Sequence, residues 1–162
     1  MQSRQYADTT VVGKKCAIIN YTDRNCDVAP LSEKYTLMKD IPIVSAATIF
    51  TLENGRNYIL VFHEALYMPD MRRTSINTNQ CRHFWEKVQD NPYPKVCPML
   101  IEIPEGEFDT FLQSYGTVMF LDTWFPTQGD LESYPHIELT SHQHWNPNKI
   151  EFPQTKIQCK RR

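Results

Sequence analysis

The amino-acid sequence predicts a mainly β fold, namely a small closed or partly closed barrel with one or two short helices. Runs of β-branched and aromatic residues recur along the chain, and clusters of turn-forming residues separate them. Two of the most apolar runs flank an Asn-Gly pair, which is the strongest local signal for a hairpin. By contrast, a single segment has its apolar residues near helical spacing.

The first expected elements are two short strands joined by a turn, over residues 9–28. This segment is rich in β-branched residues, and Gly13 and the polar run 22–25 interrupt it. Pro30 and the polar residues 32–34 then separate it from the next apolar run.

A long hairpin is expected next. Its arms are the apolar runs 41–52 and 58–63, and the turn between them contains Asn54-Gly55. Pro69 ends the second arm, since proline lacks a backbone N–H and cannot extend a ladder of hydrogen bonds.

A short helix is the expected structure of residues 74–85, with Asn77 or Thr78 as its N-cap. Prolines make residues 89–98 a loop. Four further short strands complete the expected fold, at residues 99–103, 108–112, 118–124 and 137–140.

Length and composition predict one domain. A chain of 162 residues, 41% of them hydrophobic, is long enough to bury one core and short for two. The expected domain covers residues 1–147 and includes a C-terminal β extension, whereas the polar residues 148–162 are expected to be a flexible tail. The net charge of -2 makes no case for a nucleic-acid partner, and the basic end 160–162 is expected to be a solvated terminus.

The sequence contains no apolar run near the roughly 18 residues of a membrane span, and its N-terminus lacks the apolar core of a signal peptide. We therefore expect an intracellular protein, cytoplasmic or nuclear, with no membrane partner. The five cysteines are odd in number and have no CxxC spacing, which favours free thiols in a reducing compartment.

Three sequence blocks carry a family resemblance. They are Ala7-Asp8-Thr9 with Val11-Val12-Gly13, Glu64-Ala65-Leu66-Tyr67-Met68-Pro69-Asp70 with residues 74–82, and residues 137–141 with Trp145-Asn146-Pro147. In their amino-acid sequence and in their order along the chain, the three blocks resemble the protease region of copia-type retrotransposon polyproteins, over about residues 4–147. The resemblance implies a retropepsin-like β barrel, a fold that is active as a homodimer with one catalytic Asp from each subunit.

The same resemblance implies that the catalytic Asp is missing. Its position, three residues before Ala7, is occupied by Arg4, and Gln5 and Tyr6 replace the small residues that follow it in the family. A guanidinium group cannot act as a base below about pH 12, so we expect no peptide hydrolysis by the family mechanism. Asp8 stands four residues after Arg4, roughly 13 Å farther along an extended strand, and is expected to be structural.

Three side chains are candidates for acid–base work in an enzyme of another class on the same barrel. They are Asp8, His63, which precedes Glu64 at the end of a predicted strand, and Asp122, which lies among apolar and aromatic residues. Burial of Asp122 would favour such a role. The alternative for Asp8 and His63 is a hydrogen-bonded structural side chain.

Four aromatic residues are candidates to line a pocket or a partner groove: Tyr115, Phe120, Trp124 and Phe125. In a β protein, aromatic residues more often belong to the core, and the sequence leaves both interpretations open.

A group of histidines near the C-terminal end of the sequence is a candidate for metal binding. His142 and His144 would share one face of an extended segment, with His136 and Glu138 upstream, but a polar, exposed loop is the favoured interpretation. The five glycines are too dispersed for a phosphate-binding loop. We therefore expect neither a metal nor a cofactor.

Together these features predict a retrotransposon-derived, retropepsin-like pseudoenzyme that serves as a binding or interaction domain. A homodimer is the expected assembly, and a protein or peptide is the expected partner. Two alternatives stay open. One is an enzyme of another class that uses an aromatic-lined pocket in the same barrel, and the other is an active aspartic protease with a displaced motif.

Overall fold

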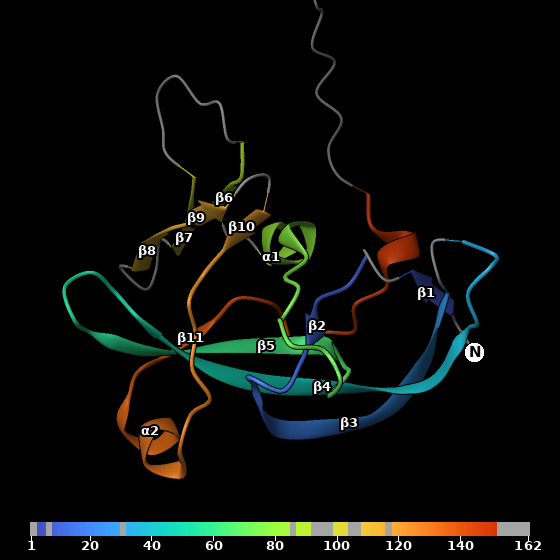
Figure 1. Cartoon of the computed structure of the whole chain (residues 1–162), viewed down its shortest axis with the longest axis horizontal. Coiled ribbons are helices and arrows are strands. Elements are labelled where there is room, and N and C mark those ends of the chain that lie inside the picture. The colour runs from blue at the N-terminus through green and yellow to red at the C-terminus, as the bar shows by residue number, and fades with distance from the viewer. Residues whose placement is uncertain are drawn as a thin grey trace, which may run out of the picture.

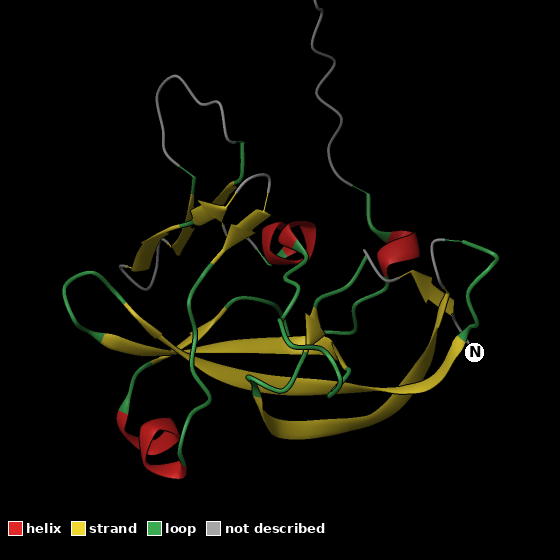
Figure 2. Ribbon diagram, viewed as in Figure 1, coloured by secondary structure: helices red, strands yellow, loops and turns green. Residues whose placement is uncertain are grey.

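The computed structural model describes residues 3–5, 8–29, 32–84, 87–91, 99–103, 108–115 and 118–151 of the chain. Strands predominate among these residues, and two short α-helices accompany them (Figure 2). The mainly β class with short helices is therefore confirmed. The described sheets are open rather than closed on themselves, so the expected closed barrel is not found among them.

A six-stranded sheet forms the centre of the molecule (Figure 1). Its strands are β1 (Ser3–Gln5), β2 (Val11–Val12), β3 (Ala17–Ala29), β4 (Met38–Thr51), β5 (Asn57–Tyr67) and β11 (His136–Glu138). Their order is β1-β3-β4-β5-β11, and β2 also pairs with β5. The three long strands pair antiparallel, whereas β1, β2 and β11 pair parallel to their neighbours. Segments far apart in the sequence thus meet in one sheet.

Two small sheets and two helices flank the central sheet. One small sheet contains β6 (Lys87–Gln89), β7 (Leu100–Ile103) and β8 (Phe108–Phe111), and the other contains β9 (Gln113–Tyr115) and β10 (Val118–Phe120). The helices are α1 (Thr78–His83) and α2 (Gln128–Ser133), and a 3-10 turn covers Pro147–Lys149. In Figure 1 the small sheets and α1 lie above the central sheet, and α2 lies below it.

The predicted hairpin is confirmed and is longer than expected. β4 and β5 pair antiparallel from Ile43 to Thr51 of β4. Gly55 lies in the connecting loop with a φ of +83°, a left-handed conformation that glycine adopts at little cost. The second arm ends at Tyr67, shortly before Pro69, as the sequence predicts.

Two strands joined by a turn occupy residues 9–28, as the sequence predicts: β2 and β3 flank a turn at residues 14–15. The expected interruption at the polar run 22–25 is wrong, because β3 runs through it, its register against β4 shifts there and Asp23 takes a φ of +61°. The hydroxyl of Thr22 donates a hydrogen bond to the carbonyl of Ile43 at 2.7 Å, which ties this bulge to β4. Pairing with β4 therefore overrides the local preference for a turn.

The predicted helix within residues 74–85 is confirmed as α1. Asn77 is its N-cap, and Oδ1 of Asn77 accepts a hydrogen bond from the backbone N–H of Gln80 at 2.8 Å. The sequence does not predict the position of the second helix, α2. Thr127 and Asp130 form a capping box at its start, but six residues are too few to display an apolar period.

Three of the four later strands are confirmed as β7, β8 and β11. The expected strand 118–124 is shorter, because β10 ends at Phe120. Trp124 instead forms a bridge with Ile49 of β4. β3 pairs with β4 only as far as Ala47, so Trp124 occupies the edge of β4 beyond that point.

Parts of two predictions lie outside the described residues. These parts are residues 92–98 of the expected loop and residues 152–162 of the expected tail. At the start of the predicted tail, Asn148 and Lys149 belong to the 3-10 turn. None of the helices in the described part of the chain is long and apolar enough to cross a membrane.

Apolar clusters pack on the central sheet. The largest cluster joins the sheet to α1 and β7, and it includes Val44, Ala46, Phe62, Cys81 and Ile101. A second cluster packs near α2 and contains Ala47, Ile59 and Val61 with Leu131 and Tyr134. A third cluster lies near β2 and contains Val11, Cys26, Val28, Ile43, Leu66 and Met68.

Three of the five cysteines lie in the described part of the chain. Cys16, Cys26 and Cys81 are buried thiols and not part of disulfides, as the sequence predicts. Burial raises the pKa of the Cys16 thiol, and a hydrogen bond with the Thr74 hydroxyl at 3.2 Å partly offsets this effect.

Candidate functional site

Arg4, which the predicted copia-type resemblance aligns with a catalytic Asp, lies in β1, where its backbone pairs with Val28 of β3. Asp8 is half-buried, and its Oδ1 accepts a hydrogen bond from the hydroxyl of Thr9 at 2.9 Å. The backbone carbonyl of Asp8 accepts a second hydrogen bond from Nε1 of Trp145 at 3.1 Å. These contacts fit the structural role expected for Asp8.

His63 of β5 lies in a hydrogen-bonded chain that crosses three neighbouring strands. Its Nδ1 lies 2.8 Å from Oγ of Ser45 in β4, and its Nε2 lies 3.1 Å from Oε1 of Glu138 in β11. The ring of the exposed His142 is edge-on to His63, with the ring centroids 6.0 Å apart. Sequence reasoning selected His63 but missed Ser45, which only the strand register brings to it.

A β-bulge positions His63. On β4, Ser45 is the single residue between Val44 and Ala46, whereas two residues, His63 and Glu64, stand opposite it on β5. Glu64 takes a φ of +54°, a left-handed conformation that is strained for a residue with a side chain.

Side chains from two other segments hold the bulge in place. The hydroxyl of Thr140 accepts a hydrogen bond from the N–H of His63 at 2.8 Å and donates one to the carbonyl of His63 at 2.7 Å. Nε2 of Gln80 in α1 donates to the carbonyl of Glu64 at 3.2 Å. Backbone groups that the bulge withdraws from the ladder are thereby satisfied.

The carboxylate of Glu64 is buried and fully engaged. It forms an ion pair with Arg24 of β3 and accepts a hydrogen bond from the backbone N–H of Trp145 at 2.8 Å. Glu64 therefore joins β3, β5 and the segment after β11, and its role is structural.

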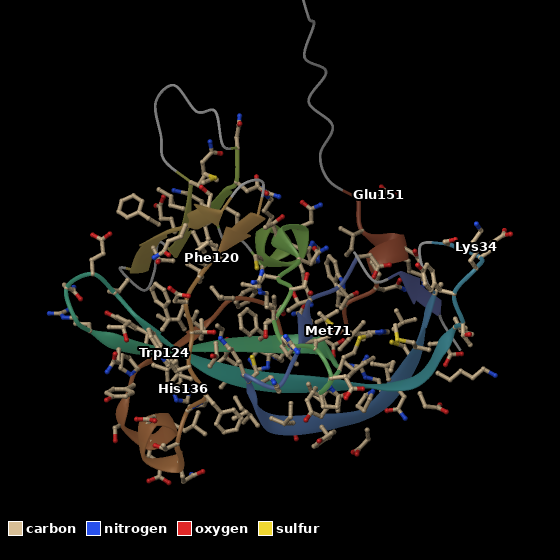
Figure 3. The ribbon with its side chains drawn as sticks, in the orientation of Figure 1. Lys34, Met71, Phe120, Trp124, His136 and Glu151 are labelled. Carbon is tan, nitrogen blue, oxygen red and sulfur yellow. The ribbon has the colours of Figure 1, made fainter. Side chains whose placement is uncertain are left out.

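A groove of about 400 Å³ lies at the tip of the β4–β5 hairpin, and we call it the tip groove. Its lining includes Phe50, Glu53, Phe111, Leu121, Asp122 and Trp124. These residues come from the hairpin, from β8 and from the segment after β10. Figure 3 labels Phe120 and Trp124 along the segment that runs from the small sheets to the central sheet.

Trp124 is fixed in the tip groove through its backbone. Its N–H donates to the carbonyl of Ile49 at 3.0 Å, and its carbonyl accepts from the N–H of Ile49 at 2.9 Å. The hydroxyl of Thr48 donates to the same carbonyl at 3.0 Å. The side chains of Trp124 and Phe111 nevertheless remain about half exposed, so two fixed aromatic surfaces face the groove.

The tip groove is acidic. Glu53 and Asp122 belong to its lining, and no Lys, Arg or His does among the described residues. Asp122 is exposed, so the burial that would favour it as an acid–base residue is absent.

The other aromatic candidates lie outside the tip groove or outside the description. Phe120 is half-buried and Phe125 is 59% exposed, and neither belongs to the lining. The side chain of Tyr115 lies outside the described part of the chain. Sequence reasoning thus selected Asp122 and Trp124 as separate candidates but missed the contributions of Phe50 and Phe111.

The histidine cluster does not form a metal site. In the part of the chain that the structure describes, no group of three or more His, Cys, Asp or Glu side chains could hold a metal ion. Nε2 of His136 instead donates to the carbonyl of Leu131 at 2.8 Å, and His142 faces His63 rather than His144.

Comparisons with known proteins give no further guide to the site. No family model matches the sequence, and neither a curated protein nor a solved structure is significantly similar to it. The copia-type resemblance therefore stays a prediction, and so do the retropepsin-like barrel and the homodimer that this resemblance implies.

Proposed function

We propose that this protein is a binding domain, inactive as an aspartic protease, whose tip groove takes an extended peptide segment with aromatic and cationic side chains. The observation that carries the proposal is the combination of exposed aromatic surfaces with two carboxylates in one groove. Descent from a copia-type protease region is part of the proposal and rests on the three sequence blocks and on Arg4 at the catalytic position.

The aromatic side chains supply the apolar part of the binding energy. Trp124 and Phe111 are 54% and 51% exposed, although side chains of this size are mostly buried in a protein without a partner. Tryptophan is among the residues that most often dominate a binding interface. The backbone bridge to Ile49 holds Trp124 in place before binding, which lowers the entropic cost of association.

Charge selects the occupant. Glu53 and Asp122 give the groove two negative charges, and its described lining contains no cation. A Lys or Arg side chain of the partner would pair with these carboxylates and also stack on the face of Trp124. An acidic segment would be repelled.

Two peptides of opposite charge test the proposal by isothermal titration calorimetry. The probes are acetyl-Lys-Phe-Lys-Phe-Lys-amide and acetyl-Glu-Phe-Glu-Phe-Glu-amide. We expect the basic peptide to bind and the acidic peptide not to bind. Equal affinity for both peptides, or no binding of the basic one, would overturn the proposal.

The carboxylates are tested separately with Asp122→Asn. The exposed ion pair contributes about 0.2–1 kcal/mol, so the affinity for the basic peptide should fall by a factor of roughly 1.4 to 5. The loss should shrink at high salt, because exposed charges are screened. An unchanged affinity would remove the charge argument while leaving the aromatic one in place.

A further inference from the structure

Four polar residues form a row across neighbouring strands of the central sheet. Asn20 of β3 lies opposite Ser45 of β4, and residues directly opposed in an antiparallel pair point to the same face. Ser45 contacts His63 of β5, which in turn contacts Glu138 of β11. We call these four residues the polar row.

With a neutral His63, the protons in the polar row have one consistent arrangement. The carboxylate of Glu138 only accepts hydrogen bonds, so Nε2 of His63 carries the proton in that contact. In the neutral ring Nδ1 is then an acceptor, and the hydroxyl of Ser45 donates to it. A serine that donates to a histidine, which a carboxylate orients, is the arrangement that activates an oxygen nucleophile.

Asn20 adds a donor on the other side of Ser45. Its side chain is exposed and makes no hydrogen bond with the rest of the described chain. An amide N–H beside a nucleophilic oxygen is able to stabilise the negative charge of a tetrahedral intermediate.

The strain of the bulge is further support for a functional role. Glu64 holds a left-handed conformation directly after His63, and Thr140 fixes the backbone of His63 on both sides. Strained backbone held by its surroundings clusters at functional sites, and bulges re-aim side chains there.

We propose that the polar row is an acyl-transfer site that hydrolyses short-chain esters. Ser45 is the nucleophile, His63 is the general base and acid, Asn20 is the oxyanion donor, and Glu138 positions His63. Ser45 is only 8% exposed and stands on its strand between the buried Ile43 and Ala47, which restricts the substrate to a small acyl group. This activity goes beyond peptide binding at the tip groove.

The reaction begins when Oγ of Ser45 attacks the ester carbonyl carbon while its proton passes to Nδ1 of His63. The carbonyl electron pair moves onto oxygen, where the Asn20 amide donates to it. Collapse of the intermediate breaks the ester C–O bond, and the alcohol leaves with the proton from Nδ1. Water then attacks the acyl-serine and gives a proton to Nδ1. The second collapse releases the carboxylic acid and returns that proton to Oγ of Ser45.

Hydrolysis of p-nitrophenyl acetate tests the activity. We expect Ser45→Ala and His63→Gln each to lower kcat/KM by at least about 100-fold. Exposed histidines hydrolyse this ester slowly on their own, so His144→Gln is the matched control and should keep the wild-type rate. A wild-type rate in a folded Ser45→Ala variant would overturn the proposal.

Covalent labelling of the wild-type protein gives a result that does not depend on the folding of a variant. Methanesulfonyl fluoride, whose methyl group is as small as the acyl group of an acetate ester, should sulfonylate Oγ of Ser45 with loss of fluoride, and mass spectrometry of the digested protein should locate the added mass on its peptide. Failure to label Ser45, or equal labelling of other serines, would contradict a nucleophilic role.

The two supporting residues have different expected signatures. Asn20→Ala should lower kcat by about 100-fold, as loss of one oxyanion donor does, with little change in KM. Glu138→Gln should lower kcat at constant KM, and Glu138→Asp should restore part of it, because the carboxylate acts only through His63. Saturating acetyl-Lys-Phe-Lys-Phe-Lys-amide should leave the esterase rate unchanged, which separates this site from the tip groove. If Glu138→Gln changed KM alone, its positioning role would be wrong.

Discussion

The buried carboxylate of Glu64 accepts a hydrogen bond from the backbone N–H of Trp145 at 2.8 Å, across 81 positions of the chain. The same carboxylate forms an ion pair with Arg24, so it connects β3, β5 and a C-terminal segment. The backbone carbonyl of Glu64 accepts a hydrogen bond from Nε2 of Gln80 in α1. This residue therefore holds together segments that no local sequence signal relates.

Replacement of Glu64 should destabilise the fold. Glu64→Ala leaves the N–H of Trp145 without its acceptor and should lower the free energy of unfolding by about 2 kcal/mol. Glu64→Gln keeps an acceptor oxygen and should cost about half as much. Urea unfolding provides the measurement, and Glu33→Ala, at an exposed position, should change stability by less than about 0.5 kcal/mol. Equal stability of Glu64→Ala and Glu33→Ala would contradict this role.

A methyl group at Gly13 should not be tolerated. Its Cβ would lie 2.3 Å from the carbonyl oxygen of Met71, which is backbone and cannot swing away. We expect Gly13→Ala to destabilise the protein by about 2 kcal/mol, as overpacking does. Gly129→Ala is the matched control, since its Cβ meets only ordinary contacts in α2 and helix propensity favours alanine by up to about 1 kcal/mol. Thermal unfolding that ranks the two variants in the opposite order would refute this explanation.

The capping box of α2 predicts a pH dependence. The pKa of Asp130 lies below its ordinary value of 3.8, because first the backbone N–H and then the hydroxyl of Thr127 donate to its carboxylate. A lowered pKa in the folded state means that this contribution to stability is present above pH 3.8 and is lost as the pH falls through the folded value. The difference in Tm between wild type and Asp130→Ala should therefore shrink between about pH 6 and pH 2. A constant difference would exclude the carboxylate as its source.

We expect no aspartic protease activity. An arginine at the position of the family's catalytic Asp cannot activate a water molecule, so a generic acid-protease substrate should stay intact at about pH 4–6. The same result is expected for Asp8→Asn. Cleavage that a pepstatin-type inhibitor blocks and that Asp8→Asn abolishes would identify Asp8 as the catalytic residue and sink the pseudoenzyme assignment.

Elements with local signals were predictable from the sequence. Asn54-Gly55 located the hairpin because glycine is suited to the left-handed conformation found there, and Asn77 located α1 because its side chain caps the first turn. The interruption expected at the polar run 22–25 was wrong for the opposite reason. Hydrogen bonds to β4, a partner that starts later in the sequence, decided the conformation of β3.

The two candidate sites were predictable only in part, because both depend on register. The contact between Ser45 and His63 exists because two residues of β5 stand opposite one residue of β4. The alternation of apolar and polar residues along a strand does not predict such a bulge. In the tip groove, Trp124 stood out as an aromatic residue. Trp124 lines the same groove as Phe50 and Phe111 because its backbone forms a bridge with Ile49. The sequence alone does not reveal this bridge.

The binding proposal is tested most directly by the affinity of acetyl-Lys-Phe-Lys-Phe-Lys-amide for two single-site variants, measured by isothermal titration calorimetry. Trp124→Ala removes an aromatic side chain from the tip groove, and Phe125→Ala removes its equally exposed neighbour outside it. We predict that Trp124→Ala weakens binding by about tenfold or more, as loss of an interface tryptophan does, while Phe125→Ala binds like wild type. Equal affinities of Trp124→Ala and wild type would contradict peptide binding at the tip groove.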